Sequence, residues 1–240
     1  MEKRVVILYG RNPVREALRG RRAHMVKEVW ASGGAAREPW LQGHDVRVVS
    51  AEEIESRCGS SSHQGICAEA GSYPYVSAEE LLRVKEPLLV ALDQVQDPQN
   101  LGSICRTAEC AGATGVIIPE RRAAEVTPAV CKASAGAVEH LRLARVRNVA
   151  DFLQDARKAE CWCYGADATD AAVAYDKPDY RGGGVVLVLG SEGSGLRPRV
   201  AAACDQLIAL PLRGKMESLG VAAAASAILY EILQNRRDSA

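Results

Sequence analysis

Aromatic side chains are scarce in this sequence of 240 residues: they make up 5%, and Phe152 is the one phenylalanine. Hydrophobic residues still make up 48% and charged residues 25%, as in an ordinary globular protein. The core must therefore be aliphatic and rich in alanine. No apolar run is long enough to span a bilayer, and the first one ends at Tyr9, too early for a signal peptide. We expect a cytoplasmic protein with no membrane segment.

Cysteine motifs for metal binding are also absent. The eight cysteines form no Cys-x-x-Cys pair, and none has a histidine at zinc-ligand spacing. Cys161 and Cys163 lie in a segment typical of a strand, so their side chains would share one face. Free cysteine behaves as a small buried hydrophobe, so we expect reduced core thiols and no metal site.

A global charge signal for nucleic acid is missing, because 30 basic residues balance 30 acidic ones. The charge is nevertheless unevenly distributed: residues 1–27 carry eight basic and two acidic side chains, and residues 28–86 carry five and ten. Four arginines of the first segment recur at three- and four-residue steps and would crowd one exposed helix face: Arg11, Arg15, Arg19 and Arg22. Such a face either holds a phosphate backbone or is simply solvated.

Strand and helix candidates alternate in the second part of the chain. The strand candidates are 88–93, 115–118, 161–166, 185–189 and 207–211. The helix candidates are 101–111, 127–135, 149–159, 196–203 and 218–236. This alternation predicts a parallel sheet covered by helices. The strand at 185–189 has no polar alternation, as expected when both of its faces are buried.

The first part of the chain has a different organisation. Strands are expected at 4–9, 26–31, 45–49 and 65–70. Asn12 suits the N-cap of a helix with Pro13 at its first position. The stretch over residues 71–86 mixes glycine, proline, serine and charged residues, as linkers do. We therefore expect three segments: an N-terminal domain over 1–70, a linker over 71–86 and a parallel α/β domain over 87–240.

The first group of functional candidates follows the strand at 88–93. A polar loop leads to Asn100, and the helix after it carries Arg106. Open α/β folds bind ligands at this carboxyl edge of the sheet. Two plainer interpretations stay open: Asn100 caps the helix, and Arg106 pairs with Glu109 or Asp97 on the surface.

Two more groups of candidates follow later strands. The strand at 185–189 runs into a turn from Gly190 to Gly195 that holds Glu192. Glycines let the backbone approach a ligand closely, although this turn matches neither a Walker A loop nor a dinucleotide fingerprint. The strand at 207–211 leads through a loop to Ser218, which suits the N-cap of an alanine-rich helix. That helix could equally be a plain core helix.

Together and in this order, the three stretches resemble the signature motifs of the SpoU (TrmH-like) family of RNA 2′-O-methyltransferases. They are LDQVQDPQNLGSICRTAECAGATGVIIP (92–119), VVLVLGSEGSGLRP (185–198) and LIALPLRGKMESLGVAAAASAILYEILQNRR (207–237). ILYGRNPVREAL near the start resembles the RlmB-like branch, and HQGICAEA (63–70) resembles its substrate-binding domain. CKASAGAVEHL (131–141) also resembles family sequence. The resemblance covers essentially the whole chain.

The resemblance implies a SPOUT methyltransferase domain with a C-terminal trefoil knot, an L30e-like RNA-binding domain at the N-terminus, and a homodimer. It implies S-adenosylmethionine (SAM) as the cofactor, in a pocket lined by Gly190, Leu210, Gly214, Met216 and Leu219. Arg106 would activate the attacking hydroxyl, and three more residues would shape the catalytic site: Asn100, Glu192 and Ser218. The arginine-rich helix would contact RNA phosphate.

The implied reaction is attack of a ribose 2′-oxygen on the sulfonium methyl group of SAM. Oxygen, carbon and sulfur must lie in line, and positioning of this kind can supply ~7–11 kcal/mol. A guanidinium stays protonated, and lowering its pKa by about five units to make it a base would cost about 7 kcal/mol. We therefore expect the charged side chain of Arg106 to stabilise the developing alkoxide.

One motif departs from the family pattern. The family's third motif usually reads Ser-Leu-Asn-Val-Ser, and this chain has Gly220 and Ala222 where the Asn and the second Ser would stand. Each lost hydrogen bond is worth ~0.5–1.5 kcal/mol.

We expect a guanosine of ribosomal RNA (rRNA) as the substrate. The alternatives are transfer RNA (tRNA), a catalytically weakened RNA-binding scaffold and, more distantly, a generic nucleotide-binding protein.

Overall fold

The computed structural model describes residues 5–169, 171–216 and 218–237. The chain forms two compact units: unit 1 holds residues 1–74 and 125–140, and unit 2 holds residues 75–124 and 141–240. The domains expected from the sequence are continuous stretches. In the structure, residues 125–140, which lie within the expected second domain, pack with the N-terminal residues as part of unit 1. Lys3 and Arg4 of the basic first segment lie outside the described residues.

Unit 1 contains a four-stranded sheet in the order β1-β4-β2-β3. Its strands are β1 (Val5–Tyr9), β2 (Val26–Ala31), β3 (Val46–Val48) and β4 (Ile66–Gly71). β4 pairs antiparallel with β1 and β2, and β2 pairs parallel with β3. The helices are α1 (Arg11–Arg19), α2 (Ala51–Cys58) and α5 (Pro128–Ala133). Short 3₁₀ helices lie at Ala23–Met25, Gly33–Arg37, Pro39–Leu41, Ser61–His63 and Ala137–Glu139.

Helix α1 begins earlier than the sequence suggests. Its N-cap is Gly10, with φ at 95°, a conformation that glycine adopts readily, and Arg11 is the first helical residue. Asn12 therefore lies inside the helix and caps nothing, so that prediction is wrong. Pro13, Val14 and Ala17 are the buried residues of α1, which sets the face that packs on the core.

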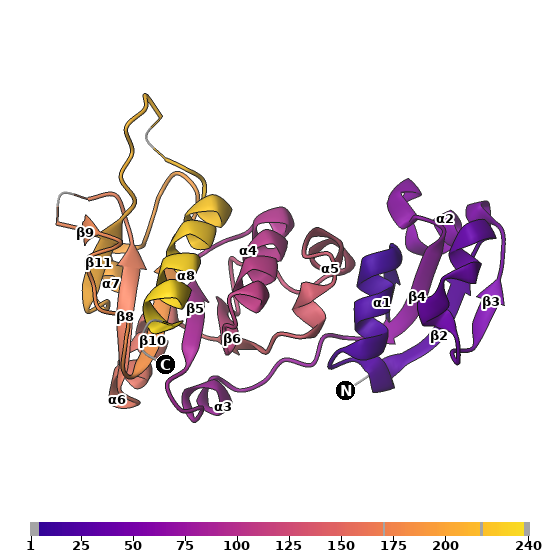
Figure 1. The fold of residues 1–240 in the computed structure, drawn as a ribbon, viewed down its shortest axis with the longest axis horizontal. Helices are drawn as coiled ribbons and strands as arrows, with labels where there is room; N and C mark the ends of the chain where they lie inside the picture. The colour runs from indigo at the N-terminus through magenta and orange to yellow at the C-terminus, as the bar shows by residue number, and fades with distance from the viewer. Residues whose placement is uncertain (1–4, 170, 217, 238–240) are drawn as a thin grey trace. The chain divides into compact units, whose positions relative to one another are not determined.

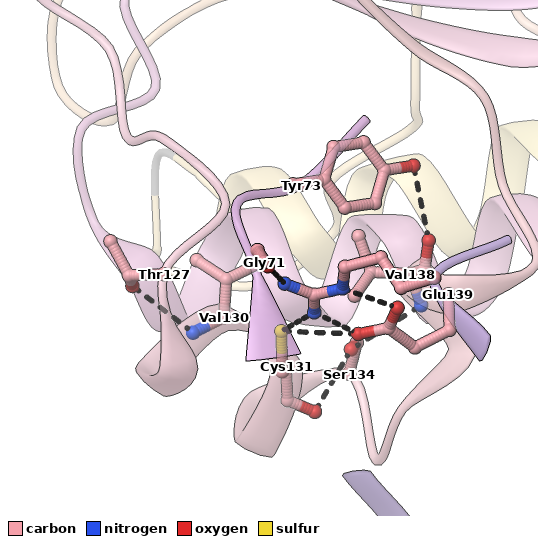
Figure 2. A network of polar contacts seen from close by, with 9 residues as sticks. Gly71, Tyr73, Thr127, Val130, Cys131, Ser134, Val138 and Glu139 are labelled. Carbon is pink, nitrogen blue, oxygen red and sulfur yellow. Dashed lines mark hydrogen bonds and ion pairs between the residues drawn. The ribbon is translucent and has the colours of Figure 1, made fainter. Parts of the chain in front are cut away.

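Residues 125–140 are tied into unit 1 by a buried ion pair (Figure 2). Nε of Arg22 donates to Oε2 of Glu139 at 2.8 Å, and its Nη2 contacts Oε1 of the same carboxylate. Arg22 also donates to Sγ of Cys131 at 3.2 Å and to the carbonyl of Gly71 at 3.4 Å. Its guanidinium carbon lies 5.6 Å from the centroid of the Tyr73 ring. Since a buried charge must be paired, the network fixes three segments against one another.

Unit 2 contains a fully parallel sheet of seven strands in the order β7-β6-β5-β10-β8-β11-β9. The strands are β5 (Leu88–Leu92), β6 (Gly115–Pro119), β7 (Leu143–Val146), β8 (Cys161–Ala166), β9 (Val173–Ala174), β10 (Gly184–Leu189) and β11 (Gln206–Ala209). Every residue of β10 is buried. The parallel α/β prediction is confirmed, and the trefoil knot stays a prediction.

Helices cover both faces of this sheet (Figure 1). They are α3 (Ala78–Leu82), α4 (Pro98–Cys110), α6 (Val149–Lys158), α7 (Pro198–Ala201) and α8 (Val221–Arg237). Phe152 and Leu153 of α6 join a core with Val186 and Val188 of β10. On the other face α4 and α8 lie side by side, and Oγ1 of Thr107 bonds to Oγ of Ser226 at 3.0 Å.

The expected linker is more ordered than its composition suggests. Ser77 caps α3 with a complete capping box, since its Oγ accepts from the backbone of Glu80 and the Glu80 carboxylate accepts from the backbone of Ser77. Val76 forms an isolated parallel bridge with Ala144 of β7. Among the described residues, no helix has both the length and the apolarity to cross a membrane.

Candidate functional site

A cavity of about 330 Å³ opens in unit 2 at the carboxyl ends of β8, β10 and β11. Parallel α/β sheets bind ligands at this edge. Apolar side chains line part of it: Leu189, Ile208, Leu210 and Ile228. Further parts of the wall come from residues 166–168 at the end of β8, from the loop after β10, residues 190–195, and from the residues Ser218 to Val221. The second and third sequence motifs therefore meet in one cavity.

The loop after β10 folds back on itself. The amide of Ser191 donates to the carbonyl of Gly195 at 3.2 Å, and the reverse bond measures 3.0 Å. A Cβ at Gly190 would lie 2.2 Å from the carbonyl carbon of Gly195, so only glycine fits. Gly193 and Gly195 have φ values of 81° and 62°, which also favour glycine. The loop thus presents backbone, free of side chains at its closest approach, to the cavity.

Two carboxylates line the same cavity. Asp167 follows β8, and its Oδ1 would lie 3.5 Å from a Cβ placed on Gly195. Glu192 belongs to the glycine loop, and its Oε1 would lie 3.8 Å from a Cβ placed on Gly220. The cavity therefore combines an apolar floor, exposed backbone and two acidic groups, which suits a ligand that carries positive charge.

The third motif enters the cavity in a way that the sequence does not predict. Helix α8 begins at Val221, and the carbonyl of Gly220 accepts the amide of Ala224 at 3.0 Å. Gly220, with φ at 81°, thus occupies the N-cap position of α8. The prediction that Ser218 is the N-cap is wrong, although Ser218 does line the cavity.

Asn100 and Arg106 do not line this cavity. Both lie on α4, whose N-cap is Asp97, since Oδ1 of Asp97 accepts from the amide of Gln99 at 3.0 Å. Asn100 is therefore free of the capping role. Arg106 is exposed and makes no ion pair with Glu109, Asp97 or any other part of the described chain. Its guanidinium is available to a ligand, and α4 contacts α8 through Thr107.

The other predicted cofactor residues divide into two groups. Gly190, Leu210 and Leu219 line the cavity together with Glu192 and Ser218. Gly214 and Met216 lie in the loop between β11 and α8 but are not among the lining residues, and the Met216 residue is 77% exposed. This loop thus contributes its two ends to the cavity.

The four predicted RNA-binding arginines have different surroundings. Arg22 is 1% exposed and paired with Glu139, so it lies on no exposed face. The prediction that Arg22 belongs to an exposed RNA-binding face is therefore wrong. Burial lowers the pKa of Arg22, but the hydrogen bond to Glu139 and the charge of that carboxylate raise it by more, so the net pKa is above its ordinary value. Arg11 pairs with Glu38 and Arg15 with Glu16, while Arg19 is exposed.

Two acidic residues of unit 2 belong to the site although the sequence motifs did not single them out. Asp93 is buried and accepts from the backbone of Arg197 at 3.0 Å and from its Nε at 2.8 Å, which holds the end of the glycine loop against β5. Asp167 lines the cavity itself. Both directly follow strands at the carboxyl edge, and that position is the signal that could have identified them.

Comparison with known proteins assigns the chain to a family. Residues 87–230 match the SpoU rRNA methylase family, and residues 7–76 match the domain described as RNA 2′-O ribose methyltransferase substrate binding. YacO of Bacillus subtilis, assigned to the TrmH family of tRNA/rRNA methyltransferases, is 38% identical over 81% of this chain and 79% of its own. A Staphylococcus haemolyticus protein assigned to the same family is 33% identical over 96% of both chains. The chain belongs to the SpoU family.

Solved structures of related proteins agree with this assignment. The AdoMet-bound rRNA methyltransferase of Sinorhizobium meliloti superposes with a TM-score of 0.81 at 27% identity, over 97% of this chain and 88% of that one. The SpoU methyltransferase AviRb of Streptomyces viridochromogenes, in complex with AdoMet, gives 0.80 at 25% identity, over 98% and 92%. Both units of the chain are therefore covered by such relatives.

Proposed function

We propose that this protein transfers a methyl group from SAM to a ribose 2′-hydroxyl, and that the target is a guanosine of rRNA. The observation that carries the proposal is the cavity in which the glycine loop 190–195 meets Gly220, inside the part of the chain that matches the SpoU methylase family. The match of residues 7–76 to a substrate-binding domain supports an RNA substrate. The Sinorhizobium meliloti relative supports ribosomal RNA.

SAM fits the cavity in size and charge. A volume of about 330 Å³ lies within the range of small-molecule sites. Asp167 and Glu192 offer carboxylates to the positive sulfonium and amino groups, and the backbone of the glycine loop offers hydrogen-bonding groups at close range. When bound, SAM supplies an electrophilic methyl group. The residues of the chain hold it and keep water away from it.

Arg106 acts on the substrate side of the reaction. Its guanidinium has no ion pair in the described chain, so its charge is available to stabilise the oxygen that develops negative charge. The proton of the hydroxyl leaves to phosphate or water. Asn100 and Ser218 supply hydrogen-bonding groups that orient the ribose, and the contact of α4 with α8 links Arg106 to the helix that begins at the cavity.

The protein acts as a homodimer in the cytoplasm, with the site near the subunit interface. Two observations support a second subunit: Arg106 lies outside the cavity of its own chain, and three exposed apolar side chains lie in or beside the loop between β11 and α8. They are Leu212, Met216 and Leu219. Light scattering on the purified protein tests this, because a monomer mass would contradict it.

Transfer of labelled methyl groups identifies the substrate. The protein is incubated with methyl-labelled SAM and either total rRNA or total tRNA from cells that lack its gene. Label on rRNA that resists alkaline cleavage is the expected result, because a methylated 2′-oxygen no longer attacks the adjacent phosphate. Label on tRNA alone would contradict rRNA as the substrate and assign tRNA in its place. SAM binding without transfer to either RNA would favour the scaffold alternative over the enzyme.

A further inference from the structure

Three arginines of unit 2 lie at the same edge of the sheet and have no role in the site described above. Arg121 and Arg122 follow β6, and Arg147 follows β7. All three are exposed, and none forms an ion pair within residues 5–169, 171–216 and 218–237. We call Arg121, Arg122 and Arg147 the carboxyl-edge arginines.

Hydrogen bonds fix the position of these arginines. Strands β6 and β7 are neighbours in register, with Pro119 opposite Val146. The amide of Glu120 donates to the carbonyl of Val146 at 2.9 Å, so Arg121 and Arg147 follow directly on a hydrogen-bonded pair at the ends of adjacent strands. At its other end the loop is held by the amide of Ala124, which donates to the carbonyl of Val95 at 2.9 Å.

The second anchor brings the loop next to the first sequence motif. Val95 lies in the connection from β5 to α4, and α4 carries Asn100 and Arg106. The chain between the anchors is only three residues long, and Arg122 within it has φ at 57°, a conformation that is uncommon outside glycine. The loop therefore presents its arginines in a defined place beside the proposed catalytic helix.

Nearby charged groups leave the cluster positive. Arg145 is already engaged: its Nη2 donates to the carbonyl of Glu120 at 3.3 Å, and its guanidinium lies 5.6 Å from the Tyr75 ring centroid. Two carboxylates, Glu120 and Glu125, flank Arg121 and Arg122 in the sequence, and neither forms an ion pair with any of the three arginines. An unpaired guanidinium offers a fork of donors that matches the oxygens of a phosphate.

We propose that the carboxyl-edge arginines bind phosphates of the substrate RNA beside the nucleotide whose ribose is methylated. This inference rests on the proposed function, because it takes RNA as the substrate and α4 as the catalytic helix. It adds a binding surface on unit 2 to the substrate-binding domain matched in residues 7–76. Phosphate contacts of this kind set register and affinity and carry no sequence information.

The test replaces Arg121, Arg122 and Arg147 by glutamine, singly and together. Binding of total rRNA, and in parallel total tRNA, is measured against salt concentration. For the triple variant we expect the Kd for RNA to rise about 10- to 100-fold near 0.1 M salt. We expect the slope of log Kd against log salt to become smaller in magnitude by about 2. The Kd for SAM and the single-turnover rate at saturating RNA are expected to stay within about threefold.

Arg142→Gln is the matched control. Arg142 is also exposed and flanks the opposite, amino end of β7, away from the carboxyl edge. An unchanged Kd and salt slope in the triple variant would overturn the proposal, and so would an equal loss in Arg142→Gln. If the unmodified protein binds RNA but transfers no methyl group, the proposed function fails, while the binding series still decides the role of the arginines.

Discussion

Gly220 has a left-handed backbone conformation that few residue types adopt readily. The family pattern has asparagine here, and both residue types tolerate the left-handed conformation that the φ of 81° requires. The sequence alone counts this difference as a lost hydrogen bond. The structure adds that Gly220 has a left-handed φ directly before α8, and that a Cβ placed on it would lie 3.8 Å from Oε1 of Glu192.

Gly220→Asn is therefore expected to be tolerated, whereas Gly220→Val is not. A β-branched residue at this φ costs about 1–3 kcal/mol of strain, and the turn it distorts lines the cavity. We expect the Kd for SAM to stay within about threefold in the asparagine variant and to rise at least tenfold in the valine variant. Titration calorimetry measures both, and equal affinities would contradict the argument.

The buried ion pair of Arg22 and Glu139 is expected to contribute strongly to the stability of unit 1. Glu139→Gln leaves a buried guanidinium without its counter-charge, which typically costs 3–5 kcal/mol. Burial also raises the pKa of the Cys131 thiol to about 12, so that thiol stays neutral and does not replace the carboxylate. We expect the free energy of unfolding of unit 1 to fall by about 3 kcal/mol or more.

Urea unfolding followed by tryptophan fluorescence measures this effect in the background of Trp162→Phe. That substitution removes the tryptophan of unit 2 and leaves Trp30 and Trp40 as reporters of unit 1. The double variant Arg22→Met with Glu139→Leu should recover much of the loss, since apolar pairs can replace buried ion pairs. A Glu139→Gln protein as stable as its parent would contradict the assigned role.

At the scale of elements, the glycine loop after β10 is the part of the cavity most sensitive to a single methyl group. In Gly190→Ala the new Cβ would meet the backbone of Gly195 at 2.2 Å, so one of the two chain segments must move. We expect the Kd for SAM to rise at least tenfold. Gly214→Ala is the control, because its Cβ would meet nothing within 4 Å. Unchanged binding in Gly190→Ala would exclude this loop as the cofactor loop.

Local patterns predicted the elements whose cause is local. The strands at 26–31 and 161–166 have the expected bounds, and the apolar run of β10 differs by one residue. Strand β7 was missed, because arginines flank and interrupt its short apolar run, Leu143–Val146. Helix α3 was missed inside a stretch with linker composition, although Ser77 and Glu80 there form the capping box.

The parts of the site that sequence did not predict depend on distant contacts. The cavity joins residues from 166 to 228, and the motif order alone does not say that Asp167 belongs to it while Met216 does not. Likewise, the spacing of Arg22 on a helical pattern suggested exposure. Its burial depends on Glu139, 117 residues further along the chain, which no periodicity encodes.

At the scale of the whole molecule, the chain passes between the two units three times, at residues 74–75, 124–125 and 140–141. Unit 1 is therefore incomplete without a segment that the family assignment places inside the methylase domain. That segment supplies Glu139, Cys131 and the carbonyl of Val138, which accepts from the Tyr73 hydroxyl at 3.2 Å.

A polypeptide of residues 1–74 alone is thus expected not to fold stably, because Arg22 would be left without its partner. Adding a peptide of residues 125–140 should restore native circular dichroism, and the same peptide with Glu139→Gln should restore much less. Cooperative unfolding of residues 1–74 on their own, unaffected by the peptide, would contradict the division into units.

The central claim is that the charged guanidinium of Arg106 promotes attack by a ribose hydroxyl on SAM held in the cavity of unit 2. The most direct measurement is the single-turnover rate of methyl transfer to RNA in Arg106→Ala and Arg106→Lys, with the Kd for SAM measured on the same samples. We expect the rate to fall about 10²- to 10³-fold in the alanine variant, to recover only partly in the lysine variant, and the Kd to stay within about twofold. An undiminished rate in Arg106→Ala would contradict the account.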